Sequence, residues 1–237
     1  GVFPPEQEIE AIRALREEFG PTVPLRIDPN CAWTVDTSVM VGRELQAELE
    51  YLEDPTATIP GMGEVRRRLL AEGIDIPQAT NMCVTEFSQI PESVREDAVQ
   101  VILGDHHFWG GLRATQELGR ICQTFDLGMS MHSNSHLGIS LMAMVHLAAV
   151  TPNLTYDVDT HYPWLHESDE IVEGGKIKFT NGQIAVPDTP GLGVEVDRDA
   201  LARAHERFLR ISYRDRDDVG YARKVIDPNW SSALPRW

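Results

Sequence analysis

Five polar residues that could hold a metal ion and supply a general base recur along the chain at nearly constant spacing. They are Asp28, Glu53, Asn81, Asp105 and His132, separated by 25, 28, 24 and 27 residues. Each closes a short apolar run and is followed by a helix-like stretch, so each interval has about the length of one strand–loop–helix–loop unit. In a parallel α/β barrel the carboxyl ends of all strands meet at one mouth, where the chemistry takes place. The spacing therefore predicts that these five side chains converge.

The first three residues of this series offer hard oxygen ligands. Asp28, Glu53 and Asn81 suit Mg²⁺, which is held by few protein oxygens and keeps water or substrate in its coordination shell. No histidine or cysteine stands at these strand ends, so zinc fits poorly. One acid at a strand end is usually a helix cap or a salt-bridge partner, but three polar residues in register favour a metal site.

The last two residues of the series close consecutive predicted strands, so they should be neighbours across the mouth. A carboxylate such as Asp105 beside the imidazole of His132 would fix its tautomer and orient it as a general base. The turn that follows, with Ser133 and Asn134, either donates hydrogen bonds to a polar ligand or caps the next helix. His161 follows the last predicted strand and reaches the same mouth, either as a substrate contact or as a structural residue. We interpret His107, His146, His166 and His205 as structural.

Composition limits the possible partners. The chain has 237 residues and a formal net charge of −16, which argues against nucleic acid or an anionic membrane as a partner. Its three cysteines, Cys31, Cys83 and Cys122, lack metal-ligand spacing and indicate reduced thiols in a cytoplasmic enzyme. No apolar run approaches the ~20 residues of a membrane-spanning helix, and no signal peptide is visible.

Helical and extended patterns alternate along most of the chain. We expect strands at 24–28, 51–53, 74–79, 99–104, 127–131 and 154–158, and helices at 5–20, 36–49, 62–72, 91–97, 110–126 and 137–150. This order indicates a parallel sheet with right-handed crossovers. A hairpin around Asn181-Gly182, a helix at 197–210 and a polar tail at 211–237 that wraps over other structure complete the prediction.

The number of strands predicts a fragment. Six parallel strands would leave two long unpaired edges, which native proteins avoid. The chain also begins at Gly1, without methionine, directly before a helix that should follow a strand. We therefore expect that one or two strands, and whatever precedes them, lie upstream, and that this is a carboxyl-terminal fragment.

Six short motifs together give a family resemblance. They are DPNCAW (28–33), YLEDP (51–55), ATNM (79–82), DHHFWGG (105–111), HSNSHLGIS (132–140) and DTHYPW (159–164). In this order and spacing, continuing through PGLGVEVD (190–197), the chain resembles the glucarate dehydratases of the enolase superfamily, in its mandelate racemase-like branch. Asparagine as third metal ligand is a distinguishing trait of that family.

The resemblance implies a modified TIM barrel of the (β/α)₇β type. Residues 1–190 would be the barrel domain with strands 3 to 8, and residues 191–237 a carboxyl-terminal extension that packs back on the barrel and on an amino-terminal α+β capping domain. That capping domain and the first strands, with a Lys-x-Lys motif that supplies a second base, would precede Gly1 and are absent from the chain. Two positions are atypical: Cys31, where glycine is common, and His106, where proline is common.

The resemblance also assigns roles to residues. It implies Mg²⁺ on Asp28, Glu53 and Asn81, with His132 as catalytic base paired with Asp105. Asn30, Ser133, Asn134 and His161 should contact a sugar diacid, and Arg216, or its near alternative Arg214, a distal carboxylate.

The implied reaction is dehydration of D-glucarate, and of its epimer L-idarate, to 5-keto-4-deoxy-D-glucarate. His132 would remove the proton α to a carboxylate, Mg²⁺ would stabilise the resulting charge, and protonated His132 would help the β-hydroxyl to leave. Two alternatives stay open. The chain could belong to another acid-sugar dehydratase or epimerase of the superfamily, or to a non-catalytic subunit related to glucarate dehydratase. We expect a cytoplasmic homo-oligomer.

Overall fold

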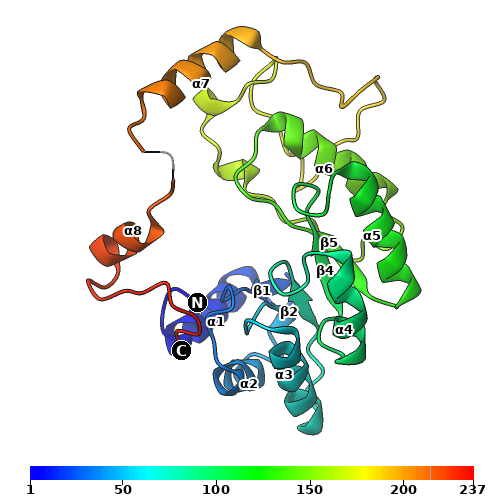
Figure 1. The fold of residues 1–237 in the computed structure, drawn as a ribbon, viewed down its shortest axis with the longest axis vertical. Helices are drawn as coiled ribbons and strands as arrows, with labels where there is room; N and C mark the ends of the chain where they lie inside the picture. The colour runs from blue at the N-terminus through cyan, green and yellow to red at the C-terminus, as the bar shows by residue number, and fades with distance from the viewer. Residues whose placement is uncertain (214) are drawn as a thin grey trace.

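A curled parallel sheet forms the centre of the computed structural model, which describes residues 1–213 and 215–237 (Figure 1). The strands are paired in chain order: β1 (Leu25–Ile27), β2 (Leu49–Glu53), β3 (Gln78–Thr80), β4 (Val101–Gly104) and β5 (Gly128–Met131). All four pairings are parallel, and helices connect the strands. The sheet is half of a barrel, so the predicted fold is confirmed for the part that the chain spans.

The α-helices are α1 (Pro5–Phe19), α2 (Val35–Glu44), α3 (Ile59–Ala71), α4 (Ile90–Arg95), α5 (Leu112–Thr124), α6 (Gly138–Val150), α7 (Arg198–Arg210) and α8 (Asp218–Val225), and the 3₁₀ helices are η1 (Phe87–Gln89), η2 (Tyr162–Trp164) and η3 (Glu167–Asp169). Figure 1 shows α2 to α6 along the outer side of the sheet, while the segment through α7 and α8 arches away from it and returns. The C-terminus ends beside the N-terminus, where the Arg236 guanidinium donates to the carbonyl of Gly1 over 2.5 Å.

Strand alternation decides which side chains face the inside of the half-barrel. Leu52 packs into the apolar cluster formed with α1, α2 and α3, whereas Tyr51 packs on the other face of the sheet. The inner face also carries Ala79, Val101 and Leu103. Because side chains alternate along a strand, the residues two positions further on face the same way. Glu53, Asn81 and Asp105 therefore point into the barrel from the ends of their strands.

Two of the predicted strands differ in the structure. Residues 74–77 are not extended into the sheet, because Pro77 has no N–H to donate, and β3 begins only at Gln78. The predicted sixth strand at 154–158 is reduced to one parallel bridge between Met129 and Leu154. There the N–H groups of Thr155 and Tyr156 both donate to Met129, and the Ser130 hydroxyl donates to the carbonyl of Asp157. A regular ladder would need those groups, so the pairing becomes irregular, and the next backbone bond to β5 is made only by the N–H of Asp159, which donates to the carbonyl of Met131 over 3.0 Å.

Most of the remaining local predictions are confirmed with small shifts in boundaries, but the helix predicted at 36–49 ends at Glu44, and Leu49 already belongs to β2. The Asn181-Gly182 turn has positive φ at both residues, as a two-residue hairpin requires, but one bridge between Thr180 and Gln183 is all that pairs there. The tail contains α8, which was not predicted. Trp237 is hydrogen-bonded to the backbone of Ala32 and Thr34. In the described residues, no helix combines the length and apolar character needed to span a membrane.

Candidate active site

The predicted oxygen ligands lie together at the carboxyl end of the sheet. Asp28 directly follows β1, Glu53 is the last residue of β2, and Asn81 directly follows β3. Ile27 is paired with Leu52, so the next residues along the two strands, Asp28 and Glu53, are neighbours. All five residues of the spaced series stand where the sequence places them, at consecutive strand ends.

The burial, bonding and charge of these oxygens fit the binding of a divalent cation. Glu53 is 7% exposed, and within the described part of the chain its carboxylate makes no hydrogen bond or ion pair. The Oδ1 atom of Asn81 is buried without a partner. Burial raises the pKa of Asp28, and burial together with the charge of Asp28 raises that of Glu53. Two carboxylates that repel each other, with an unpaired amide oxygen at the end of the next strand, form a set that Mg²⁺ would hold, since it prefers such hard ligands.

The histidine and the aspartate of the predicted dyad are in contact. Gly104 is paired with Met131, which brings Asp105 and His132 side by side, and Nδ1 of His132 lies 2.9 Å from Oδ2 of Asp105. Because a carboxylate can only accept, Nδ1 carries the proton and Nε2 is left as the basic atom. Asp105 is 1% exposed; burial opposes its ionisation, but hydrogen bonds from His132 and His107 hold its pKa below the ordinary value. The ring of His132 stacks on Phe108 at 5.8 Å.

His107, interpreted from the sequence as structural, belongs to this network. Its Nδ1 lies 2.6 Å from Oδ1 of Asp105, and its backbone N–H donates to the same oxygen over 2.8 Å. Its Nε2 lies 2.7 Å from the Ser140 hydroxyl, which is also 3.1 Å from Nε2 of His106. The signal available in the sequence was the His106-His107 pair directly after a strand-end aspartate.

The residues expected to contact substrate occupy several settings around the mouth. Ser133 is fully buried, and its hydroxyl accepts a hydrogen bond from the backbone N–H of His161 over 3.1 Å. Asn134 is exposed. Asn30 donates to Asp28 from both its backbone and its side chain, at 2.7 and 2.8 Å. Ser133 therefore links the β5 loop to His161, while Asn30 orients a predicted metal ligand.

The turn that contains Ser133 and Asn134 does not cap the helix that follows it. The N-cap of α6 is Leu137, which has no side-chain cap, and the carboxylate of Glu170 accepts from the N–H of Gly138 at 3.0 and 3.2 Å. The alternative reading of this turn as a helix cap is therefore wrong: Ser133 is bonded to His161 instead, and Asn134 is exposed.

The predicted distal-carboxylate contact lies away from this cluster. Arg216 is exposed and pairs with Asp218 at 2.7 Å at the start of α8. Its role in substrate binding stays a prediction. The alternative residue, Arg214, lies outside the described residues.

The atypical Cys31 occupies a position that favours glycine. Its φ is +60°, in the left-handed region, and the preceding Asn30 has φ of +52°. Residues other than glycine, asparagine and aspartate rarely adopt this backbone conformation. Glycine, which the resemblance leads us to expect here, would adopt this conformation without strain.

Comparison with known proteins decides the family. The family model "Enolase C-terminal domain-like" matches residues 1–200. This chain belongs to that family. Over its whole length it is 53% identical to a probable glucarate dehydratase of Streptomyces coelicolor. That alignment covers 53% of the relative, so this enolase-family chain spans about half the length of the protein it matches.

Solved structures agree with the family assignment. An enolase from Gibberella zeae, determined with magnesium, formate and sulfate, is 51% identical and has a TM-score of 0.92, covering 99% of this chain and 53% of the other. An enolase from Pseudomonas fluorescens with bound magnesium, potassium and tartrate is 47% identical with the same TM-score and the same coverage. The chain therefore has the fold of about half of each of these enolase-superfamily proteins.

Proposed function

We propose that this chain carries the metal site and one catalytic base of a Mg²⁺-dependent acid-sugar dehydratase. Its substrate would be D-glucarate, with L-idarate also accepted, and its product 5-keto-4-deoxy-D-glucarate. The observation that carries the proposal is the meeting of two groups at consecutive strand ends. One is the oxygen set of Asp28, Glu53 and Asn81, and the other is the pair formed by His132 and Asp105.

The chemistry divides between these two groups. Mg²⁺ held by the three oxygens would act as a Lewis acid for the negative charge that develops on the substrate carboxylate. Nε2 of His132 takes the proton from the carbon next to that carboxylate, while Asp105 holds the imidazole in the required tautomer. The proton then passes from His132 to the departing β-hydroxyl, which leaves as water. Proton removal and proton return thus use the same side chain.

The polar groups around the mouth would hold the diacid. Asn134 and His161 lie on the loops after β5 and before η2, and Ser133 joins those loops through its hydrogen bond to His161. The similarity to a probable glucarate dehydratase supports the choice of substrate. We also propose a cytoplasmic location, which is consistent with free, buried thiols at Cys31, Cys83 and Cys122.

A substrate panel tests the proposal. The protein, as its organism produces it, is incubated with D-glucarate, L-idarate, galactarate and aldonates in the presence of Mg²⁺, and keto-acid formation is followed by a carbonyl reagent and by NMR. We expect keto acid from D-glucarate and L-idarate, and none after chelation of Mg²⁺. Turnover of a different acid sugar would support the alternative of another dehydratase of the superfamily. Change of configuration without water loss would indicate an epimerase, and no turnover a non-catalytic subunit.

A further inference from the structure

Asp54, the residue after the predicted ligand Glu53, has the most heavily bonded carboxylate of this region. It is fully buried. Its Oδ1 accepts from the Thr80 hydroxyl at 2.6 Å and from the N–H of Cys83 at 3.3 Å, and its Oδ2 accepts from the N–H groups of Asn81 and Met82 at 2.7 and 3.0 Å. This carboxylate thus accepts from every backbone N–H between positions 81 and 83, in the turn that carries the predicted ligand Asn81.

The backbone of Asp54 bonds to two further segments of the site, the loop after Asp28 and strand β3. Its carbonyl accepts from the N–H of Cys31 at 2.8 Å, in the loop that begins at Asp28, and its own N–H donates to Ala79 at 2.9 Å. Its φ is +35°, outside the usual range for a residue with a side chain. Such a conformation persists where the surroundings fix it. Asp54 therefore ties together the three loops that carry Asp28, Glu53 and Asn81.

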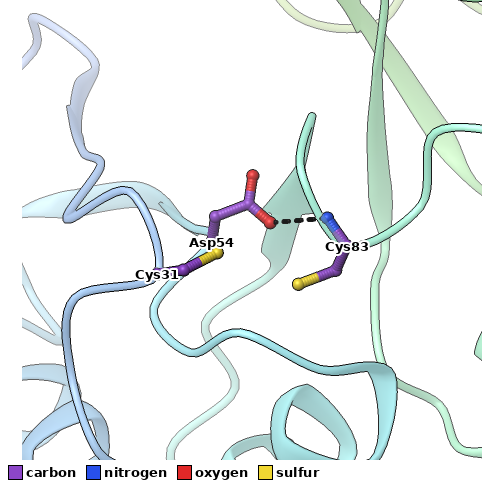
Figure 2. Close-up of side chains that lie close together, drawn as sticks. All are labelled: Cys31, Asp54 and Cys83. Carbon is purple, nitrogen blue, oxygen red and sulfur yellow. Dashed lines mark hydrogen bonds between the residues drawn. The ribbon is translucent and has the colours of Figure 1, made fainter. Parts of the chain in front are cut away.

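The same place contains two thiols, which raises the question of a second metal site. Figure 2 shows Cys31 and Cys83 on either side of Asp54, and their ligand atoms lie within 4.8 Å of one another. However, both carboxylate oxygens of Asp54 already accept hydrogen bonds, and the Cys83 thiol lies 3.2 Å from the carbonyl of Thr56, to which it donates. A hydrogen bond with Cys31, and burial, raise the pKa of Cys83 and keep its thiol neutral. This cluster is closed interior rather than an ion site.

We infer that Asp54 is a positioning residue for the metal site: its carboxylate fixes the turn 80–83 so that Oδ1 of Asn81 stays aimed beside Glu53 and Asp28. The inference rests on the proposed function, since it assigns the turn a role in Mg²⁺ binding. Mg²⁺ demands near-ideal octahedral geometry, so a small displacement of one ligand weakens binding strongly. Without the carboxylate, the N–H of Asn81 would lose its acceptor, and those of Met82 and Cys83 would keep only the Thr80 hydroxyl, so the turn would be held less firmly.

The test compares Mg²⁺ affinity with thermal stability in the protein as its organism produces it. Asp54→Asn keeps the shape but replaces one acceptor oxygen by an amide donor. We expect its Mg²⁺ affinity, measured by calorimetry without substrate, to fall about 10–100-fold, as for other residues that orient metal ligands. Raising Mg²⁺ should restore much of the turnover number. Unchanged Mg²⁺ affinity in a folded Asp54→Asn protein would overturn the inference.

Glu170→Gln is the matched control. Glu170 is also a buried carboxylate that accepts from backbone N–H groups, those of Gly138 and Ile171, but it caps α6 instead of a ligand turn. The Glu170→Gln substitution should lower the melting temperature and leave Mg²⁺ affinity unchanged. If it weakens Mg²⁺ binding as much as Asp54→Asn does, the effect of Asp54 is general destabilisation and the inference fails.

A second pair of variants covers the case in which Asp54→Asn does not fold. Thr80→Val removes one donor to Asp54 and, with it, an acceptor for the N–H groups of Met82 and Cys83, whereas Thr80→Ser keeps the hydroxyl that makes all three bonds. We expect weaker Mg²⁺ binding in Thr80→Val and near-normal binding in Thr80→Ser; equal affinities would overturn the inference. The outcome for the proposed function is separate. A wild-type protein that binds Mg²⁺ but does not dehydrate glucarate refutes the substrate alone, whereas one that binds no Mg²⁺ refutes both.

Discussion

Nδ1 of His107 lies 2.6 Å from Oδ1 of Asp105. The other oxygen of this carboxylate faces His132 at 2.9 Å, so one buried aspartate orients two imidazoles. A carboxylate held from both sides cannot rotate away from the base. Substitutions in this network should therefore lower turnover less, the further the substituted residue lies from the reacting proton.

The largest loss of turnover is expected when the base itself is replaced. His132→Asn should lower turnover by roughly 10²–10⁴-fold, because general acid–base catalysis contributes about that much, and should leave Mg²⁺ affinity nearly intact. Asp105→Asn should cost less, since it disturbs the tautomer without removing the base. Exchange of the substrate α-proton with deuterated solvent separates the roles. If His132→Asn dehydrates D-glucarate at close to the wild-type rate, His132 is not the base, and His161 is the next candidate.

The smallest loss of turnover in the network is expected when His107 is replaced. His107→Asn removes the side-chain hydrogen bond to Asp105, although the backbone N–H at the same position still reaches Oδ1. A net loss of about 1 kcal/mol for one such bond corresponds to roughly a fivefold lower turnover number. His166→Asn is the control, because His166 is exposed and bonds to Ser168. A His107 variant as impaired as His132→Asn would give His107 a direct catalytic role.

Removal of a predicted metal ligand should affect ion binding before anything else. Asn81→Ala should weaken Mg²⁺ binding at least about tenfold, since even residues behind the ligands cost that much. Asn153→Ala is the control, because Oδ1 of Asn153 is also buried without a partner but lies near Leu127, before β5. In a crystal with Mg²⁺, the oxygens of Asp28, Glu53 and Asn81 should lie within about 2.0–2.6 Å of one ion. An oxygen turned toward the outer helices would exclude that residue.

The sequence predicted the strand-end series because it depends on local rules. Apolar runs of three to five residues, followed by one polar residue and a helix, locate a strand end without knowledge of the partner strand, and alternation then decides the inward face. The prediction failed where the outcome depends on other segments. The strand at 154–158 stops because Ser130, on a neighbouring strand, takes the carbonyl of Asp157.

The same distinction holds within the site. Asp105 and His132 are at consecutive strand ends, so their contact follows from register. The roles of Asp54 and His107 depend on left-handed or turning backbone and on donors 26 or more residues away, such as Thr80 at the end of β3 and Ser140 in the first turn of α6. Spacing alone carries no information about such contacts. In both cases the visible signal was a further polar residue within two positions of the strand-end residue.

The open sheet gives a prediction about the isolated 237-residue chain. Among the described residues no strand covers the outer edge of β1, and β5 has one bridge beyond it, at Leu154. Exposed edges of this kind favour association with other chains. Expressed alone, residues 1–237 should aggregate or unfold without a sharp transition in chromatography and thermal melts. A monomer with one cooperative transition would contradict this expectation.

The pH dependence of stability should reveal the buried histidine behind the dyad. Burial, and then the charges of His107 and His106, lower the pKa of His136 from 6.5 to about 4. Its Nε2 lies 2.8 Å from the Thr160 hydroxyl, and the residue is 7% exposed. Because the folded-state value is depressed, the neutral form is favoured in the native protein. The stabilising contribution of neutral His136 is present above pH 6.5, the ordinary pKa of histidine. It is lost as the pH falls from 6.5 toward 4.

Replacement of His136 by glutamine should remove this loss. The wild-type protein should lose up to about 3 kcal/mol of unfolding free energy from this residue between about pH 7 and pH 4, whereas His136→Gln should show a flatter profile over that range. Denaturant unfolding at a series of pH values measures the difference. His166→Gln, at an exposed histidine, should follow the wild-type curve. Parallel curves for wild type and His136→Gln would mean that His136 is protonated in the folded protein, or that another group dominates the acid limb.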